Sequence, residues 1–182
     1  MLVKTDEQRK RTYNGKLVSE NLDLGKIFDE KKIGKARFNV EVKGLDMKGR
    51  YPQTYIKGNV SSFEYCDYEY EDIQLDGIYK DGGFNGHLSM DDDNGSVKID
   101  GVFNFTKSVP TLNLHASVRH FRPNELNLSD KYIDSDISFD FSADFKGNSL
   151  DDINGRIWVD SLKMNAPDDN GYFMEYFSLV AN

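Results

Sequence analysis

The feature that most constrains the fold of this chain is an alternation of apolar and polar residues that is repeatedly interrupted by glycine on its apolar side. In the segment 38–44, Phe38, Val40 and Val42 alternate with polar residues, and Gly44 closes the apolar series. A period of two is typical of strands with one buried face, because successive strand residues point to opposite sides. Six further segments follow the same pattern: 56–60, 75–79, 84–88, 97–105, 139–147 and 153–159.

Glycine supplies no side chain for packing and weakens a strand, so its repetition on the apolar face indicates either a sheet that bends sharply or an interior with little room. An ordinary β-sandwich or barrel whose strands bend at glycine is the simplest alternative. The glycines in this phase are Gly44, Gly58, Gly77, Gly86, Gly101, Gly147 and Gly155. The apolar and aromatic residues predicted to share their face are Phe38, Val40, Val42, Ile56, Val60, Leu75, Tyr79, Phe84, Leu88, Val97, Ile99, Phe103, Phe105, Leu112, Leu114, Phe139, Phe141, Phe145, Ile157 and Val159.

Strands follow one another along most of the chain, and about 10–12 are expected. We predict them at 13–19, 36–44, 54–65, 68–80, 83–90, 95–106, 110–121, 136–147, 153–165 and 171–181. Two short helical turns fit between them, at 21–28, where Asn21 can cap the first turn, and at 123–126, where proline suits a first helical position. Connections rich in Gly, Asn and Asp favour hairpins, and crossover helices for parallel pairing are not found. The sequence therefore predicts an all-β, antiparallel fold.

Charge and hydropathy exclude several classes of function. The 182 residues carry a formal net charge of −8, whereas a nucleic-acid-binding protein needs a basic face. No segment approaches the roughly 18 apolar residues of a membrane span, and the chain begins without the apolar core of a signal peptide. Any membrane anchor or export signal is therefore expected outside these residues.

The order of elements is repeated within the chain. The segment 141–147 resembles 38–44, and 172–179 resembles 68–75, each with comparable neighbours on both sides. We therefore predict that residues 1–12 form a tether or an incomplete strand, that 13–106 form a first β repeat unit, and that 107–182 form a second, truncated unit continuous with the first.

Residues with catalytic or metal-binding potential do not have the spacing of a known catalytic or metal-binding motif. The acidic segment 91–95 lacks the bidentate glutamate of a calcium loop and is better interpreted as a hairpin turn. His87, His115 and His120 have no metal-ligand spacing, and Cys66 is the only cysteine, surrounded by acidic neighbours. We therefore expect no enzymatic activity, no catalytic residue, no metal and no cofactor.

The order of these segments resembles that of the AsmA/TamB-like proteins of Gram-negative envelopes. The resemblance rests on five segments, 21–26, 38–44, 58–65, 70–77 and 84–90, and spans roughly residues 13–182. It implies an elongated, curved sheet folded into an open trough, a β-taco, that bridges the inner and outer membranes through the periplasm. In such a trough the apolar residues and glycines named above would line a groove in which the acyl chains of phospholipids or fatty acids slide.

The resemblance also implies partners. These are the remainder of the same long chain, which would anchor this segment in the envelope, and proteins of outer-membrane assembly. Edge-to-edge self-association is a further expectation, because an open sheet leaves unpaired edges.

Two other classes of function remain open from the sequence. Tyr65, Tyr68, Tyr70 and Trp158 are candidates for the sugar-stacking platform of a carbohydrate-binding β-sandwich in a secreted or surface protein. Against this, Tyr68 and Tyr70 alternate with acidic residues and are predicted on an outer strand face. The other class is a β-augmentation partner, whose open edge would template strands of a client protein.

Overall fold

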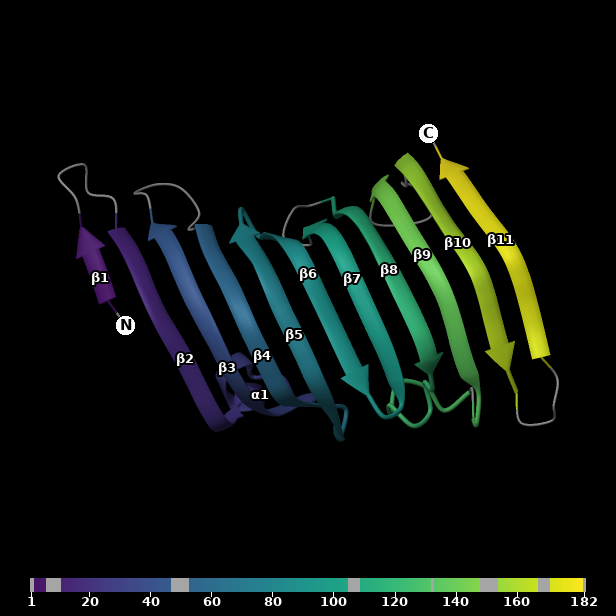
Figure 1. The fold of residues 1–182 in the computed structure, drawn as a ribbon, viewed down its shortest axis with the longest axis horizontal. Coiled ribbons are helices and arrows are strands. Elements are labelled where there is room, and N and C mark those ends of the chain that lie inside the picture. The colour runs from purple at the N-terminus through teal and green to yellow at the C-terminus, as the bar shows by residue number, and fades with distance from the viewer. Residues whose placement is uncertain are drawn as a thin grey trace.

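The structure is a computed structural model that describes residues 2–5, 11–46, 53–104, 109–131, 133–147, 154–166 and 171–181. Its eleven strands form one antiparallel sheet in which each strand lies beside the next in sequence (Figure 1). The strands are β1 (Leu2–Thr5), β2 (Arg11–Asp23), β3 (Ile33–Asp46), β4 (Gln53–Tyr65), β5 (Tyr68–Lys80), β6 (Gly83–Asp92), β7 (Gly95–Asn104), β8 (Thr111–Phe121), β9 (Asp136–Lys146), β10 (Asn154–Asn165) and β11 (Gly171–Ala181). Because β1 and β11 lie at opposite ends of this order, the sheet is open, as predicted.

Two hairpins show why the strands turn where they do. Cys66 and Asp67, between β4 and β5, have φ values of 52° and 61°, and Asp81 and Gly82, between β5 and β6, have values of 51° and 76°. Positive φ at both central residues is the mark of a type I′ turn, whose twist matches that of the flanking strands. Cys66 is therefore a turn residue.

The only helix in the described part of the chain is α1 (Leu24–Phe28), which lies within the predicted helical turn 21–28. Its N-cap is Asp23 rather than Asn21, because the Asp23 carboxylate accepts a hydrogen bond from the Lys26 amide at 3.0 Å. The second predicted turn, at 123–126, is a series of tight turns in which the Leu126 amide donates to the Arg122 carbonyl at 3.1 Å. None of the described helical segments has the length and apolar character required to cross a bilayer.

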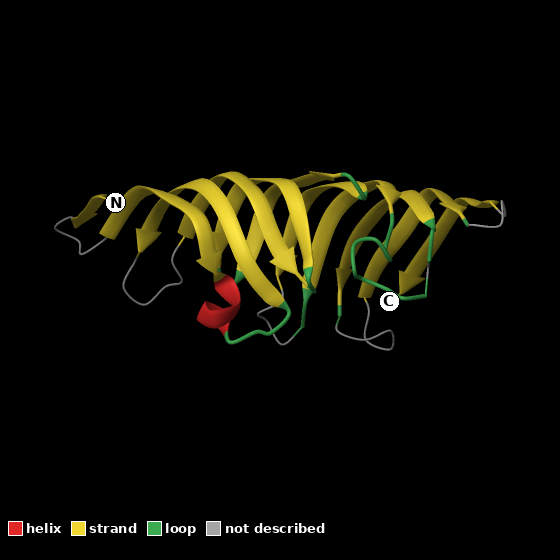
Figure 2. Ribbon diagram, turned by 90° about the horizontal axis from the view of Figure 1, so that it is seen from below, coloured by secondary structure: helices red, strands yellow, loops and turns green. Residues whose placement is uncertain are grey.

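The sheet is a single layer that arches along its length, and α1 lies beneath the arch (Figure 2). We call the side that carries α1 the concave face and the opposite side the convex face. Because no second layer covers the described sheet, few apolar side chains are buried, and of the described residues named next only Leu126 is completely so. The buried apolar residues are Ala36, Val40, Tyr70, Ala116, Val118, Leu126 and Ala143.

The strand register aligns the apolar residues in continuous rows. Residues directly opposite each other in an antiparallel pair project to the same face. One row crosses eight strands from β3 to β10 through Val40, Gly58, Leu75, Leu88, Ile99, Ala116, Phe141 and Val159. The alternation predicted for single strands is therefore assembled into a band that runs across these eight strands.

Three glycines lie side by side in the next row, where Gly77 pairs with Gly86 and Gly86 with Gly101. A Cβ atom built on Gly86 would overlap the carbonyl of Asp76. Gly101 has a φ of 142° and would place its Cβ atom against the backbone of Leu114. The concave backbone is too tightly curved at these positions for a side chain, so the glycines permit bending and do not widen the groove.

The sheet continues across the predicted boundary between the two repeat units, because β7 pairs with β8 over the full length from Ser96/Arg119 to Asn104/Thr111. The order of β2, α1, β3, β4 and β5 recurs as β8, the turns at 123–127, β9, β10 and β11. Within the segment 1–12, β1 pairs with β2 from Leu2/Asn14 to Thr5/Arg11. This strand therefore has a partner within the chain.

Candidate functional site

An open groove of about 410 Å³ lies on the concave face over β3 to β6, next to α1. The described atoms that it exposes are apolar. Its lining consists of Leu24, Ala36, Phe38, Val60, Phe63, Tyr65, Tyr70, Ile73, Leu75, Leu88 and Met90. A groove of this kind offers dispersion contacts and shelter from water to an apolar ligand, and no polar group that would fix the orientation of a polar one.

A local irregularity in β5 turns Tyr70 into this groove. Asp72 has a φ of 47°, which interrupts the alternation so that Tyr70 and Ile73, three residues apart, share the concave face. Tyr70 is only 8% exposed, and its ring meets that of Tyr68 edge to face at 4.8 Å between centroids. The prediction that Tyr70 lies on an outer strand face is therefore wrong.

The turns at 123–127 bond to Tyr70, one of the residues that line the groove. Leu126 is fully buried, and its carbonyl accepts a hydrogen bond from the Tyr70 hydroxyl at 2.7 Å. The side-chain amide of Asn127 donates to the Cys66 carbonyl at 3.1 Å. These two contacts attach a segment of the second unit to the β4–β5 hairpin of the first. Burial raises the pKa of the Tyr70 hydroxyl to about 12.

The predicted lining residues lie partly within the groove and partly beyond it. Phe38, Val60, Leu75 and Leu88 line the groove itself. Phe105 lies outside the described residues. By strand register, the following project to the same concave face elsewhere along the sheet: Val40, Val42, Ile56, Tyr79, Phe84, Val97, Ile99, Phe103, Leu112, Leu114, Phe139, Phe141, Phe145, Ile157 and Val159.

The predicted glycines follow the same register. Gly44, Gly58, Gly77, Gly86, Gly101 and Gly155 belong to the concave rows. Gly147 follows β9, where its amide donates to the Pro110 carbonyl at 3.1 Å. The rings of Tyr13 and Phe84 cover Gly44 and Gly77, so that the bare backbone at these two positions is shielded by a neighbouring aromatic side chain.

Sequence reasoning missed seven groove residues: Leu24, Ala36, Phe63, Tyr65, Tyr70, Ile73 and Met90. Ile73 and Met90 could have been predicted from the sequence, because Ile73 continues the alternation of Leu75 and Met90 that of Leu88, and both leucines were predicted to line the groove. Leu24 and Tyr70 could not, because Leu24 belongs to a helix and Tyr70 lies beyond Asp72, whose positive φ interrupts the alternation.

The convex face carries a ladder of charged and polar side chains. One row contains, in strand order, Lys16, Glu41, Lys57, Asp76, His87, Asp100, His115 and Ser142. The Lys57 ammonium lies 2.6 Å from the Asp76 carboxylate, and this bond holds the pKa of Asp76 below its usual value. His87 Nδ1 lies 2.9 Å from Asp100 Oδ1. The ladder keeps the face behind the groove hydrated.

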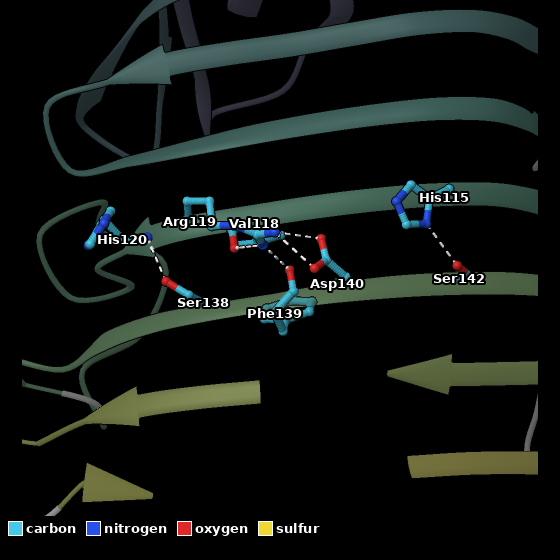
Figure 3. A network of polar contacts seen from close by, with 8 residues as sticks. All are labelled: His115, Val118, Arg119, His120, Ser138, Phe139, Asp140 and Ser142. Atoms are coloured by element: carbon cyan, nitrogen blue, oxygen red, sulfur yellow. Dashed lines mark hydrogen bonds and ion pairs between the residues drawn. The ribbon is translucent and has the colours of Figure 1, made fainter. Parts of the chain in front are cut away.

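A second polar network lies toward the end of β8 and the start of β9 (Figure 3). Arg119 donates to both carboxylate oxygens of Asp140, at 2.9 and 2.8 Å, and to the carbonyls of Val118 and Phe139. The hydrogen bonds from Arg119 lower the pKa of the Asp140 carboxyl. His120, with a φ of 48°, marks a bulge here, and its amide donates to Ser138 Oγ at 2.9 Å.

The acidic segment 91–95 forms the hairpin between β6 and β7. The Asp92 carboxylate accepts hydrogen bonds from the Tyr68 hydroxyl at 2.6 Å and from the amides of Glu71 and Asn94. Desolvation, together with the bond to Asp92, raises the pKa of Tyr68 to about 12. Asp92 thus anchors the hairpin, and among the described residues no group of His, Cys, Asp and Glu side chains is arranged to hold a metal ion.

The aromatic residues considered for sugar stacking do not meet on one surface. Tyr65 and Tyr70 line the concave groove. Trp158, on β10, pairs with Ser142 and Ser178 in the row of the convex face. The sheet therefore separates Trp158 from the other aromatics.

Comparisons with known proteins gave no match to any family model, to any curated protein or to any solved structure.

Proposed function

We propose that this chain is a non-enzymatic lipid-binding segment whose concave face holds the acyl chains of phospholipids or fatty acids. The observation that carries the proposal is the open groove of about 410 Å³ with its apolar lining. Apolar rows continue from this groove across the sheet. They extend the apolar surface along which an acyl chain slides.

The free energy of removing an acyl chain from water favours its binding to this apolar surface. Removing one methylene group from water is worth about 0.8 kcal/mol, so even part of an acyl chain gains several kcal/mol from contact with the groove. The groove is open along its side, which lets a charged headgroup remain in water while the acyl chain is covered. The convex ladder of Lys57, Asp76 and their neighbours keeps the other side of the same sheet hydrated.

In cellular terms, we propose that the segment belongs to a periplasm-spanning protein similar to the AsmA/TamB-like proteins. Its task there is phospholipid transport between the inner and outer membranes, support of outer-membrane protein assembly, or both. The resemblance of the sequence segments and the open, curved antiparallel sheet support this assignment. The membrane anchor is assigned to other parts of a longer chain.

The experiment is to purify the protein from Gram-negative cells without detergent and to identify bound lipid by native mass spectrometry and lipid extraction. Leu75→Glu places a carboxylate in the groove, where it has no partner, and we expect it to abolish lipid binding. The matched control is Gln74→Glu, which adds the same charge one residue away on the exposed convex side.

We expect the wild type and Gln74→Glu to carry phospholipid or fatty acid at similar levels. Circular dichroism of both variants verifies that the sheet is intact. A wild-type protein free of lipid, or equal lipid in both variants, would contradict the proposal.

A further inference from the structure

The net charge of the chain is concentrated on the strands that form the groove. Nine carboxylates and two lysines lie within residues 53–92, the span of β4, β5 and β6, so this span carries a net charge of −7 out of −8 for the whole chain. The same three strands supply eight of the eleven residues that line the groove. The groove therefore lies on the part of the chain that carries most of its net charge.

Exposed carboxylates adjoin the lining residues along these strands. Glu69 and Glu71 flank Tyr70 in β5. Asp91 follows Met90 in β6, and all three carboxylates are exposed. Adjacent Cα atoms lie about 3.8 Å apart, whereas charges act over a screening length of about 10 Å at an ionic strength of about 0.1 M. These carboxylates therefore impose a negative potential on the groove, although none of them lines it.

The basic residues near α1 do not offset this charge. The segment 23–32 contains α1 and reaches the groove through Leu24. It carries three acidic and three basic residues and is neutral overall. One of its lysines, Lys26, is paired with the Asp23 carboxylate at 2.8 Å. A phosphate group that projects from the groove therefore gains no net attraction from this segment.

We propose that the groove selects phospholipids whose headgroup carries an ammonium group, such as phosphatidylethanolamine, over anionic lipids such as phosphatidylglycerol. This inference rests on the proposed lipid-binding function and names the class of headgroup. The acyl chains contact the groove in the same way in both lipids, so the apolar contacts do not distinguish them. The headgroups differ in charge. An ammonium group offsets the phosphate charge and is attracted by the carboxylates, whereas an uncompensated phosphate is repelled.

The test measures lipid uptake by the full chain, freed of lipid, from vesicles that contain equal amounts of phosphatidylethanolamine and phosphatidylglycerol with identical acyl chains. Because both lipids come from the same membrane surface, repulsion between the protein and the vesicle affects both equally. Lipid bound to the protein is separated from the vesicles and quantified by mass spectrometry. In about 20 mM salt we expect about fivefold more phosphatidylethanolamine, and in about 500 mM salt nearly equal amounts, because salt screens exposed charges.

Two double variants locate the charges that matter. Glu69→Lys combined with Glu71→Lys reverses two exposed carboxylates beside the groove and should abolish the preference. Asp144→Lys combined with Glu175→Lys changes the net charge by the same amount at exposed positions of β9 and β11, and should retain it. Circular dichroism verifies that both double variants keep the sheet.

Equal uptake of the two lipids by the wild type in low salt, a preference that high salt leaves unchanged, or its loss in both double variants alike would overturn the headgroup inference. Each of these results still shows bound lipid, so the lipid-binding proposal would stand. A wild type that takes up neither lipid would contradict the lipid-binding proposal itself, and the headgroup preference with it.

Discussion

The Tyr70 hydroxyl donates a hydrogen bond to the carbonyl oxygen of Leu126 at 2.7 Å, between residues 56 positions apart in the sequence. The bond fastens the turns at 123–127 to a residue that lines the apolar groove. Tyr70 is 8% exposed and Leu126 is 0% exposed, so the contact is shielded from water. It is therefore a structural link between the two halves of the sheet at a residue that lines the groove.

We expect Tyr70→Phe to lower the free energy of unfolding by about 1 kcal/mol, because it removes the hydroxyl donor and leaves the Leu126 carbonyl without this bond. Urea denaturation followed by circular dichroism measures the change. Tyr79→Phe is the matched control at a site 40% exposed, where the effect should stay within about 0.5 kcal/mol. Equal stability of Tyr70→Phe and the wild type would show that the bond contributes nothing.

The protein should lose stability in alkali. The pKa values of Tyr68 and Tyr70 are raised to about 12, whereas an unfolded tyrosine titrates near 10. The folded state therefore retains these protons at higher pH than the unfolded state does. The resulting stabilisation is fully present below about pH 10 and is lost as pH rises toward 12. Urea midpoints measured between pH 8 and 11.5 test this, and Tyr68→Phe combined with Tyr70→Phe should flatten the decline.

Gly101→Ala should destabilise the sheet by roughly 2 kcal/mol, because Gly101 has a φ of 142° and a Cβ atom there would overlap the Asn113 carbonyl. Gly171→Ala is the control, since the nearest atom to its added Cβ is Asn165 Oδ1 at 3.9 Å. Thermal unfolding of both variants gives the comparison. If both alanines were tolerated equally, the concave curvature would not depend on glycine at position 101.

Arg119→Lys should cost about 1 kcal/mol although it conserves the charge, because one ammonium group cannot replace both Nη2, which bonds the Asp140 carboxylate, and Nη1, which bonds two backbone carbonyls. Since the pKa of Asp140 is lowered in the folded state, its contribution is present above about pH 4 and is lost as pH falls below that value. The difference between Arg119→Lys and the wild type should thus be larger at pH 7 than at pH 3. Chemical denaturation at both pH values measures it, and a difference independent of pH would contradict this account.

The strands could be predicted closely from the sequence because alternation and turn chemistry are local signals. Gly171–Ala181 and Tyr68–Lys80 lie at the predicted positions, and the Asp81–Gly82 turn has the residues that a type I′ hairpin requires. The open, single-layer sheet could not be derived from alternation, which suits a sandwich equally well. It was expected only through the resemblance to a family of trough-shaped proteins.

The groove was predicted less completely because it depends on irregular positions. The positive φ of Asp72 interrupts the alternation between Tyr70 and Ile73, and no local pattern in the acidic stretch around it indicates where the alternation breaks. Leu126 reaches Tyr70 from a turn distant in sequence, which only the three-dimensional fold reveals. The glycines were identified correctly as a feature of the apolar face, but whether they bend the sheet or widen the groove required the backbone itself.

The central claim is that acyl chains lie on the concave face of the sheet. The most direct measurement places a photo-reactive phenylalanine analogue at Leu88, which lines the groove, or at the adjacent Ser89, which lies in the convex rows. Each protein is irradiated in intact Gram-negative cells, and cross-linked lipid is identified by mass spectrometry. We predict a phospholipid adduct at position 88 and none above background at position 89. No adduct at position 88, or equal adducts at the two positions, would contradict the account.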